Sequence, residues 1–316
     1  MTTLASRRNL WFAISLIVIV PGLVSLILFG VRLGIDFTGG TLWELQFDKP
    51  VATELVQSTL AANGFDNSIV QRTGAESENT LLIRMRELTE GSAEKDTLEA
   101  ALNAEIGPFT ELEFSTVGGA ISSQIRNRAV LAVAIASIGI LLYIAYAFRN
   151  TQNPMLYGIC AIVAMLHDVL IVLGLFSILG EIAGVEIDAL FVTALLTVIG
   201  FSVHDTIVVF DRIRENLQKR LDISFEEVVN YSLAQTLVRS VNTSLTVTFT
   251  LLALYLFGGS TTREFVLALL IGVISGTYSS IFNASQLLVA WEKGEIQRLF
   301  GRFRGGGTGP EVAPSR

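Results

Sequence analysis

Five ionisable residues interrupt otherwise apolar stretches of the sequence, and their types suit them to moving a proton. Asp168 and Asp205 each follow directly after one of the two histidines, His167 and His204, and Arg239 begins a later apolar stretch. A charged side chain within a membrane span costs roughly 2.5 to 3.5 kcal/mol by insertion scales, so each of these residues suggests a function. Carboxyl and imidazole groups can load and release a proton when their surroundings change. The pattern points to proton transfer coupled to movement inside a membrane.

Each of these residues also has a structural interpretation. Asp205 and Arg239 fall at similar depth on antiparallel helices, so they could pair, either as a permanent ion pair or as one that protonation of Asp205 breaks. Asp168 could be hydrogen-bonded within the helix bundle, and His167 and His204 could act as hydrogen bonders alone.

Two of the apolar stretches carry polar residues at three- and four-residue spacing, which places them on one helical face. In the fifth stretch these are Arg239, Asn242, Thr243, Thr246 and Thr250. In the sixth they are Gly272, Ser275, Gly276, Ser279, Asn283 and Gln286. Lipid cannot satisfy such groups, so we expect the two faces to meet each other or a wet cavity. For the sixth stretch, close helix packing through its small residues is the alternative.

The elements that must hold these residues are transmembrane helices. The chain has 316 residues, of which 51% are hydrophobic and 16% charged, with a mean hydropathy of +0.57. Its apolar residues form runs of the roughly 20 residues that an α-helix needs to cross a bilayer. Six spans are predicted, at residues 9–31, 129–148, 154–180, 187–210, 239–258 and 264–291.

Net charge, cysteine and histidine content, and the absence of catalytic motifs argue against several functions. A net charge of -7 argues against nucleic-acid binding, which needs a basic surface. The single cysteine, Cys160, and the two separate histidines form no metal-binding cluster, so no metal or other cofactor is expected. No nucleophile, phosphate-loop or metalloprotease motif occurs, so an enzyme is not expected.

Lysine and arginine in the short connections set the orientation. They gather on the side shared by both termini, which predicts that both termini are cytoplasmic. The cytoplasmic segments are then 1–8, 211–238 and 292–316, of which the last is expected to be disordered. In 211–238, Ser224 and Glu227 have the spacing of a capping box, so we expect a helix along the membrane surface.

The segment 32–127 then lies outside the membrane. Residues 31–127 hold 15 acidic and 7 basic residues, a solvated composition. The periodicity predicts the order strand, helix, strand, strand, helix, strand, which is typical of a ferredoxin-like α+β domain. The predicted fold class is a polytopic helical membrane protein with this domain between its first two spans.

Four stretches together resemble the SecF family of bacterial protein-export membrane proteins. They are GIDFTGGTLWEL (34–45), LHDVLIVLG (166–174), VIGFSVHDTIVVFDRIREN (198–216) and LVRSVNTSLT (237–246). Their motif residues include Gly34, Asp36, Phe37, Gly39, Gly40, Asp211 and Arg212, and the resemblance runs from about residue 7 to 295 in the family's order.

The resemblance implies a half-unit of the resistance-nodulation-division type in the bacterial cytoplasmic membrane. Such a chain would work with SecD beside the SecYEG channel and draw unfolded polypeptides outward with the proton motive force. Asp205 would be the proton-coupling aspartate, Arg239 its partner, and Asp168 the aspartate of the family's His-Asp pair. His204 stands where the family usually has asparagine.

Two other functions remain open at this point. A small-molecule or lipid exporter of the same superfamily would need an aromatic-lined pocket outside the membrane, whereas the outer segment is small, acidic and poor in aromatic residues. A purely structural subunit that stabilises its partner would need none of the buried charges.

Overall fold

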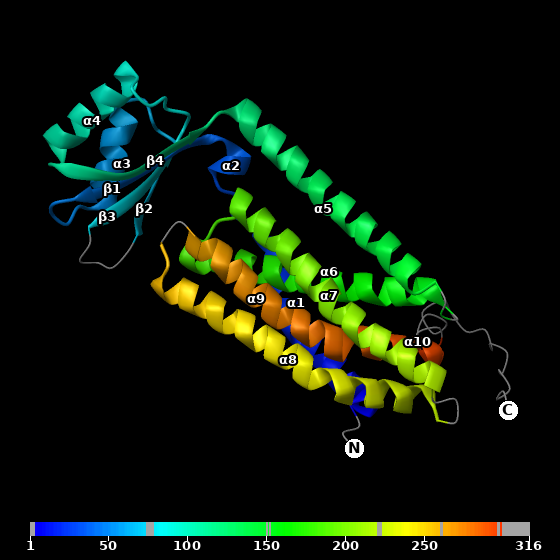
Figure 1. Ribbon diagram of the computed structural model, residues 1–316. Helices are drawn as coiled ribbons and strands as arrows, with labels where there is room; N and C mark the ends of the chain where they lie inside the picture. Colours follow the sequence, from blue (N-terminus) through cyan, green and yellow to red (C-terminus); the bar gives the residue numbers. More distant parts are fainter. Residues whose placement is uncertain are drawn as a thin grey trace. The chain divides into compact units, whose positions relative to one another are not determined.

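A bundle of long apolar helices and a small α+β unit make up the computed structural model of the chain (Figure 1). The structure describes residues 4–73, 79–149, 151, 153–219, 223–259, 262–295 and 298. It divides into two compact units: a helix unit of residues 1–31, 133–185 and 190–316, and a sheet unit of residues 32–132 and 186–189.

Within the described residues, six helical segments are long and apolar enough to cross a membrane, as the sequence predicts. The first five contain α1 (Arg8–Leu28), α5 (Gly119–Ala147), α6 (Pro154–Ala183), α7 (Ala189–Lys219) and α8 (Phe225–Phe257). The sixth consists of α9 (Arg263–Ser279), the π-helical turn η4 (Ser280–Ala284) and α10 (Ser285–Glu292).

The segment 211–238 does not form the separate surface helix that we expected. Its first part continues α7 to Lys219, and α8 runs without a break from Phe225 to Phe257. The predicted capping box is present, because Ser224 and Glu227 each bond the other's backbone N–H. No glycine or proline follows within α8, so the helix that this box starts can continue into the apolar stretch. The predicted disordered tail lies largely outside the described residues.

Helix packing in the helix unit depends on glycines. A Cβ atom on Gly22 of α1 would lie 2.9 Å from the Cα of Gly174 in α6, so the two backbones touch. A Cβ atom on Gly272 of α9 would overlap the side chain of Val198 in α7. Small residues let membrane helices approach this closely, which is the packing alternative raised for the sixth span.

The sheet unit follows the predicted strand and helix order. It contains β1 (Gly40–Phe47), α3 (Thr53–Ala62), β2 (Ile69–Thr73), β3 (Thr80–Met85), α4 (Ala93–Glu105) and β4 (Phe109–Val117). The antiparallel strands have the spatial order β2-β3-β1-β4, and Figure 1 shows α3 and α4 on one face of the sheet. Alternate residues of each strand point to that face, so Trp43, Leu45 and Ile83 pack there against Leu60 and Leu98.

Candidate functional site

The Asp168 carboxylate is the centre of a buried polar cluster in the helix unit. Its side chain is 1% exposed, and its two oxygens accept hydrogen bonds at 2.6 Å from the hydroxyls of Ser202, Ser275 and Ser279. A fourth contact, at 2.9 Å, comes from Nδ1 of His167. The donors belong to α6, α7 and α9, so this one carboxylate joins three helices.

The cluster continues from His167 to the first helix. Nε2 of His167 lies 3.1 Å from the Ser15 hydroxyl of α1, and this hydroxyl lies within hydrogen-bond distance of both amide atoms of Asn283. The Tyr278 ring stacks on His167 at 6.2 Å, and its hydroxyl donates to the carbonyl of Trp11 at 2.7 Å. Asn283 lies in the π-helical turn, a feature that often marks functional positions.

The six residues predicted as the polar face of the sixth span therefore point inward. Ser275, Ser279, Asn283 and Gln286 are all buried, and three of them belong to the cluster around Asp168 and Ser15. This arrangement places hydrogen-bonding groups where lipid cannot reach them, as expected.

Asp205 has different surroundings. It is 3% exposed, and its Oδ2 atom has no hydrogen-bond partner among the described residues. The possible pairing with Arg239 is not made in this structure: the described residues contain no ion pair within 4 Å between the two, and the Arg239 side chain is exposed. Arg239 and the exposed His204 are near enough to act on Asp205 through their charges. Equal depth on neighbouring helices does not fix the rotation of each helix, which explains the difference.

The polar face of the fifth span is also placed differently from our expectation. Arg239, Asn242, Thr243, Thr246 and Thr250 are all exposed on α8, so this face does not meet the polar face of the sixth span. The three threonine hydroxyls donate to backbone carbonyls four residues earlier, which satisfies them within the helix. Arg239 and Asn242 keep their polar groups at the surface of the chain. Between α8 and α9, the Thr277 hydroxyl instead donates a hydrogen bond to the Ser244 hydroxyl at 2.5 Å.

The glycine motif builds the start of the sheet unit. Gly39 and Gly40 have φ angles of +76° and +116°, which side-chain-bearing residues rarely adopt, and a Cβ atom on Gly40 would lie 2.6 Å from the carbonyl oxygen of Met85. Asp36 accepts the backbone N–H of Ala189 at 2.8 Å, and Phe37 is buried.

Three further motif residues have structural contacts. Gly34 donates its N–H to Ile187 at 2.9 Å. Asp211 pairs with Arg214 at 2.6 Å and Arg212 with Glu215 at 2.7 Å along the exposed side of α7. Such exposed pairs add little stability.

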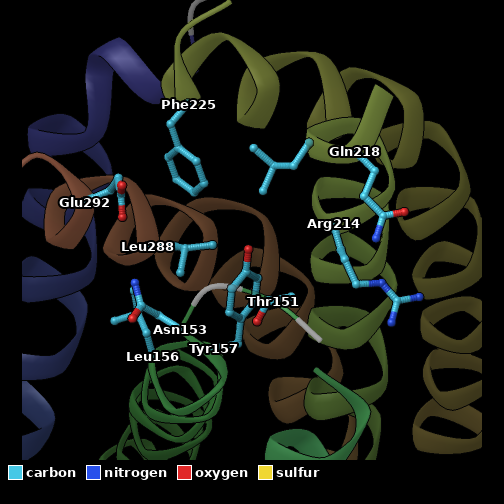
Figure 2. A pocket seen from close by; sticks show the side chains of 10 residues that line it. Thr151, Asn153, Leu156, Tyr157, Arg214, Gln218, Phe225, Leu288 and Glu292 are labelled. Atoms are coloured by element: carbon cyan, nitrogen blue, oxygen red, sulfur yellow. The ribbon is translucent and has the colours of Figure 1, made fainter. Parts of the chain in front are cut away.

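A separate cavity of about 280 Å³ opens where α6 begins and α7 ends. Figure 2 shows Tyr157, Phe225 and Leu288 around it, with Arg214 and Glu292 further out. Its lining combines apolar and polar side chains, and Arg214 also pairs with Asp211. None of the residues predicted to couple protons lines it.

Sequence reasoning missed Ser15, Ser202 and Tyr278. Ser202 lies one helical turn before Asp205 and is a polar residue in an apolar run, which is a usable signal. Ser15 is a single small residue among apolar neighbours and carries no pattern of its own.

Comparison with known proteins identifies the family of the chain. Residues 98–294 match the family model described as "Protein export membrane protein SecD/SecF, C-terminal", and residues 24–51 match the "SecD/SecF GG Motif". The chain is 58% identical to "Protein translocase subunit SecF" of Thermobaculum terrenum over 97% of both chains. It is 46% identical to the protein of the same name from Anaerolinea thermophila, over 96% of this chain and 98% of that one.

A solved structure has the same fold. The crystal structure of SecDF, a translocon-associated membrane protein from Thermus thermophilus, matches with a TM-score of 0.79 and 35% identity. The match covers 92% of this chain and 38% of the longer SecDF chain. The glycine motif and the long C-terminal match fall on the elements described above. The chain belongs to the SecF family of protein translocase subunits.

Proposed function

We propose that the chain is a non-enzymatic subunit of the Sec export machinery. With SecD, it uses the proton motive force to drive late translocation of unfolded polypeptides that emerge from the SecYEG channel. The names of its relatives support the export role, and the solved SecDF structure supports SecD as the partner. The chain would lie in the bacterial cytoplasmic membrane with both termini inside, as the lysine and arginine distribution favours.

The observation that carries the proton-coupling proposal is the contrast between the two buried aspartates. All four acceptor positions of the Asp168 carboxylate are occupied, whereas Oδ2 of Asp205 has no partner among the described residues. An ionised carboxylate with a buried oxygen that has no partner is costly, so we expect Asp205 to bind a proton, reach water or meet a group from another chain. A carboxylate of this kind can load and release protons.

The exposed polar face of α8 supplies a place for SecD. An arginine that faces lipid at the start of a span is still unfavourable, and a second helix bundle against Arg239 and Asn242 would remove that cost. Protons could then move between Asp205 and groups at this interface. One charge that crosses the membrane field releases about 2.3 kcal/mol per 100 mV, which is enough to shift a two-state helix arrangement.

The sheet unit would be the outer, ferredoxin-like domain that acts on the polypeptide. Its βαββαβ order and its sheet order support this assignment. The apolar connection through α1 would carry helix movement to it.

The test is export in membranes reconstituted with SecD and SecYEG, with and without a proton gradient. Asp205→Asn and Arg239→Ala should each abolish the gradient-dependent part of the rate and leave the gradient-independent part unchanged. Asp96→Asn, a charge removal at an exposed position of α4, is the control and should keep the full rate. Wild-type gradient dependence in both membrane variants would refute the proposal.

A further inference from the structure

The contacts around Asp168 bear on its charge. An ionised carboxylate has four acceptor positions and no proton, and here three hydroxyls and one ring nitrogen approach them. A protonated carboxyl group would need one of the three hydroxyls to accept its proton instead of donating to it. The geometry therefore fits the ionised form, and Nδ1 of His167 must be the donor in its contact with Oδ1.

A buried anion needs a positive partner. Among the described residues, no lysine or arginine nitrogen lies within 4 Å of Asp168, and the His167 ring is the basic group in contact with it. The other titratable group against the ring is the hydroxyl-bearing Tyr278, which already donates to Trp11. A lone charge in the interior is far more costly than a paired one. Charge balance thus favours a positively charged imidazolium.

The second ring nitrogen has a matching acceptor. If Nε2 carries a proton, it donates to the Ser15 hydroxyl at 3.1 Å, and this hydroxyl donates to Oδ1 of Asn283 at 3.1 Å. The π-helical turn η4 carries Asn283. The amide nitrogen of Asn283 lies 2.9 Å from the same hydroxyl, so hydrogen bonding alone also permits a neutral ring. The charge of Asp168 decides between the two arrangements.

From these contacts we infer that His167 and Asp168 form a fixed ion pair that fastens α1 to the helix bundle, and that neither carries the transported proton. The fastening point is Ser15, seven residues before the close crossing of Gly22 and Gly174. Ser25 and Ser177, which share a hydrogen bond of 2.8 Å, hold the same two helices further along. The pair positions α1 so that it moves with α6. This inference rests on the proposed function only in assuming that α1 transmits movement.

The charge of the His167 ring can be measured directly, because the chain has only one other histidine, which can be replaced. His204→Asn leaves His167 as the one histidine, and ¹⁵N-histidine labelling of that full chain with SecD in lipid nanodiscs reports both ring nitrogens. At neutral pH we expect both nitrogens of His167 to be protonated. Asp168→Asn should leave one of them without a proton. Ser25→Ala, on α1 like Ser15 but outside the cluster, should change nothing. One unprotonated ring nitrogen of His167 in the His204→Asn protein would overturn the inference.

A paired substitution separates a fixed ion pair from a proton carrier. His167→Gln alone leaves the Asp168 charge without a partner, so it should lower the unfolding temperature and reduce gradient-dependent export at least tenfold. Adding Asp168→Asn removes that charge, and the double variant should recover export to within about threefold of wild type. If Asp168 carried the transported proton, the double variant would stay as inactive as Asp205→Asn. Gradient dependence that survives in Asp205→Asn would contradict the proposed function, whereas a failed recovery contradicts the ion pair.

Discussion

The crossing of α1 and α6 gives a prediction whose size follows from the structure. In Gly174→Ala, the new Cβ atom would lie 2.7 Å from the Cα of Gly22, about 0.7 Å short of the 3.4 Å at which ordinary contacts begin. Backbone atoms cannot rotate away, so the two helices must separate. Overpacking of this kind costs about 1 to 3 kcal/mol. The separation would also strain the bonds of Ser15 and Ser25 to α6.

The matched control is Gly200→Ala in α7, where a Cβ atom would meet nothing within 4 Å. Both substitutions gain about 1 kcal/mol of helix propensity, so the difference between them isolates the clash. Thermal unfolding of both variants in the same nanodiscs, followed by tryptophan fluorescence, should show Gly174→Ala unfolding several degrees below Gly200→Ala. Equal or higher stability of Gly174→Ala would refute the close crossing.

Three more predictions concern single residues. Burial raises the pKa of Glu186 above its ordinary 4.5, although nearby arginines lower it. The folded protein therefore binds this proton more tightly than the unfolded chain does. Its stability falls as the pH rises from 4.5 through the pKa of the folded state. Glu186→Gln should remove that part of the pH dependence of the unfolding temperature, and an unchanged pH profile would contradict it. Gly40→Ala should cost about 1 to 3 kcal/mol of stability, because its φ is +116° and its Cβ would meet the Met85 carbonyl; a wild-type unfolding temperature would contradict this. His204→Asn should keep export within about twofold of wild type, since the side chain is exposed, and a tenfold loss would give this histidine a direct role.

Local patterns predicted the elements of the fold. The length of the apolar runs predicted six helices that could cross a membrane, and alternating apolar residues such as Trp43, Leu45 and Phe47 predicted β1. The capping box at Ser224 marked the start of α8. These features depend on residues close together in the sequence, so a single sequence contains them.

The buried polar cluster around Asp168 could not be predicted in the same way. Helical spacing placed Ser275 and Ser279 on one face, but it does not say which helix that face meets. Ser202 and Ser15 come from two other helices, and their approach depends on the glycine crossings of the bundle. For the same reason, matching depths suggested an ion pair between Asp205 and Arg239 that this structure does not form.

The exposed Arg239 on α8 also has a consequence for the amount of this protein in a cell. Arg239 is exposed on α8 at the start of the predicted fifth span, and its charge would oppose stable insertion wherever that surface met lipid. A solitary copy would then sit in the bilayer at a disadvantage that the proposed SecD partner would remove. Surplus chains should be short-lived, and their abundance should follow that of the companion, even when their own synthesis is increased.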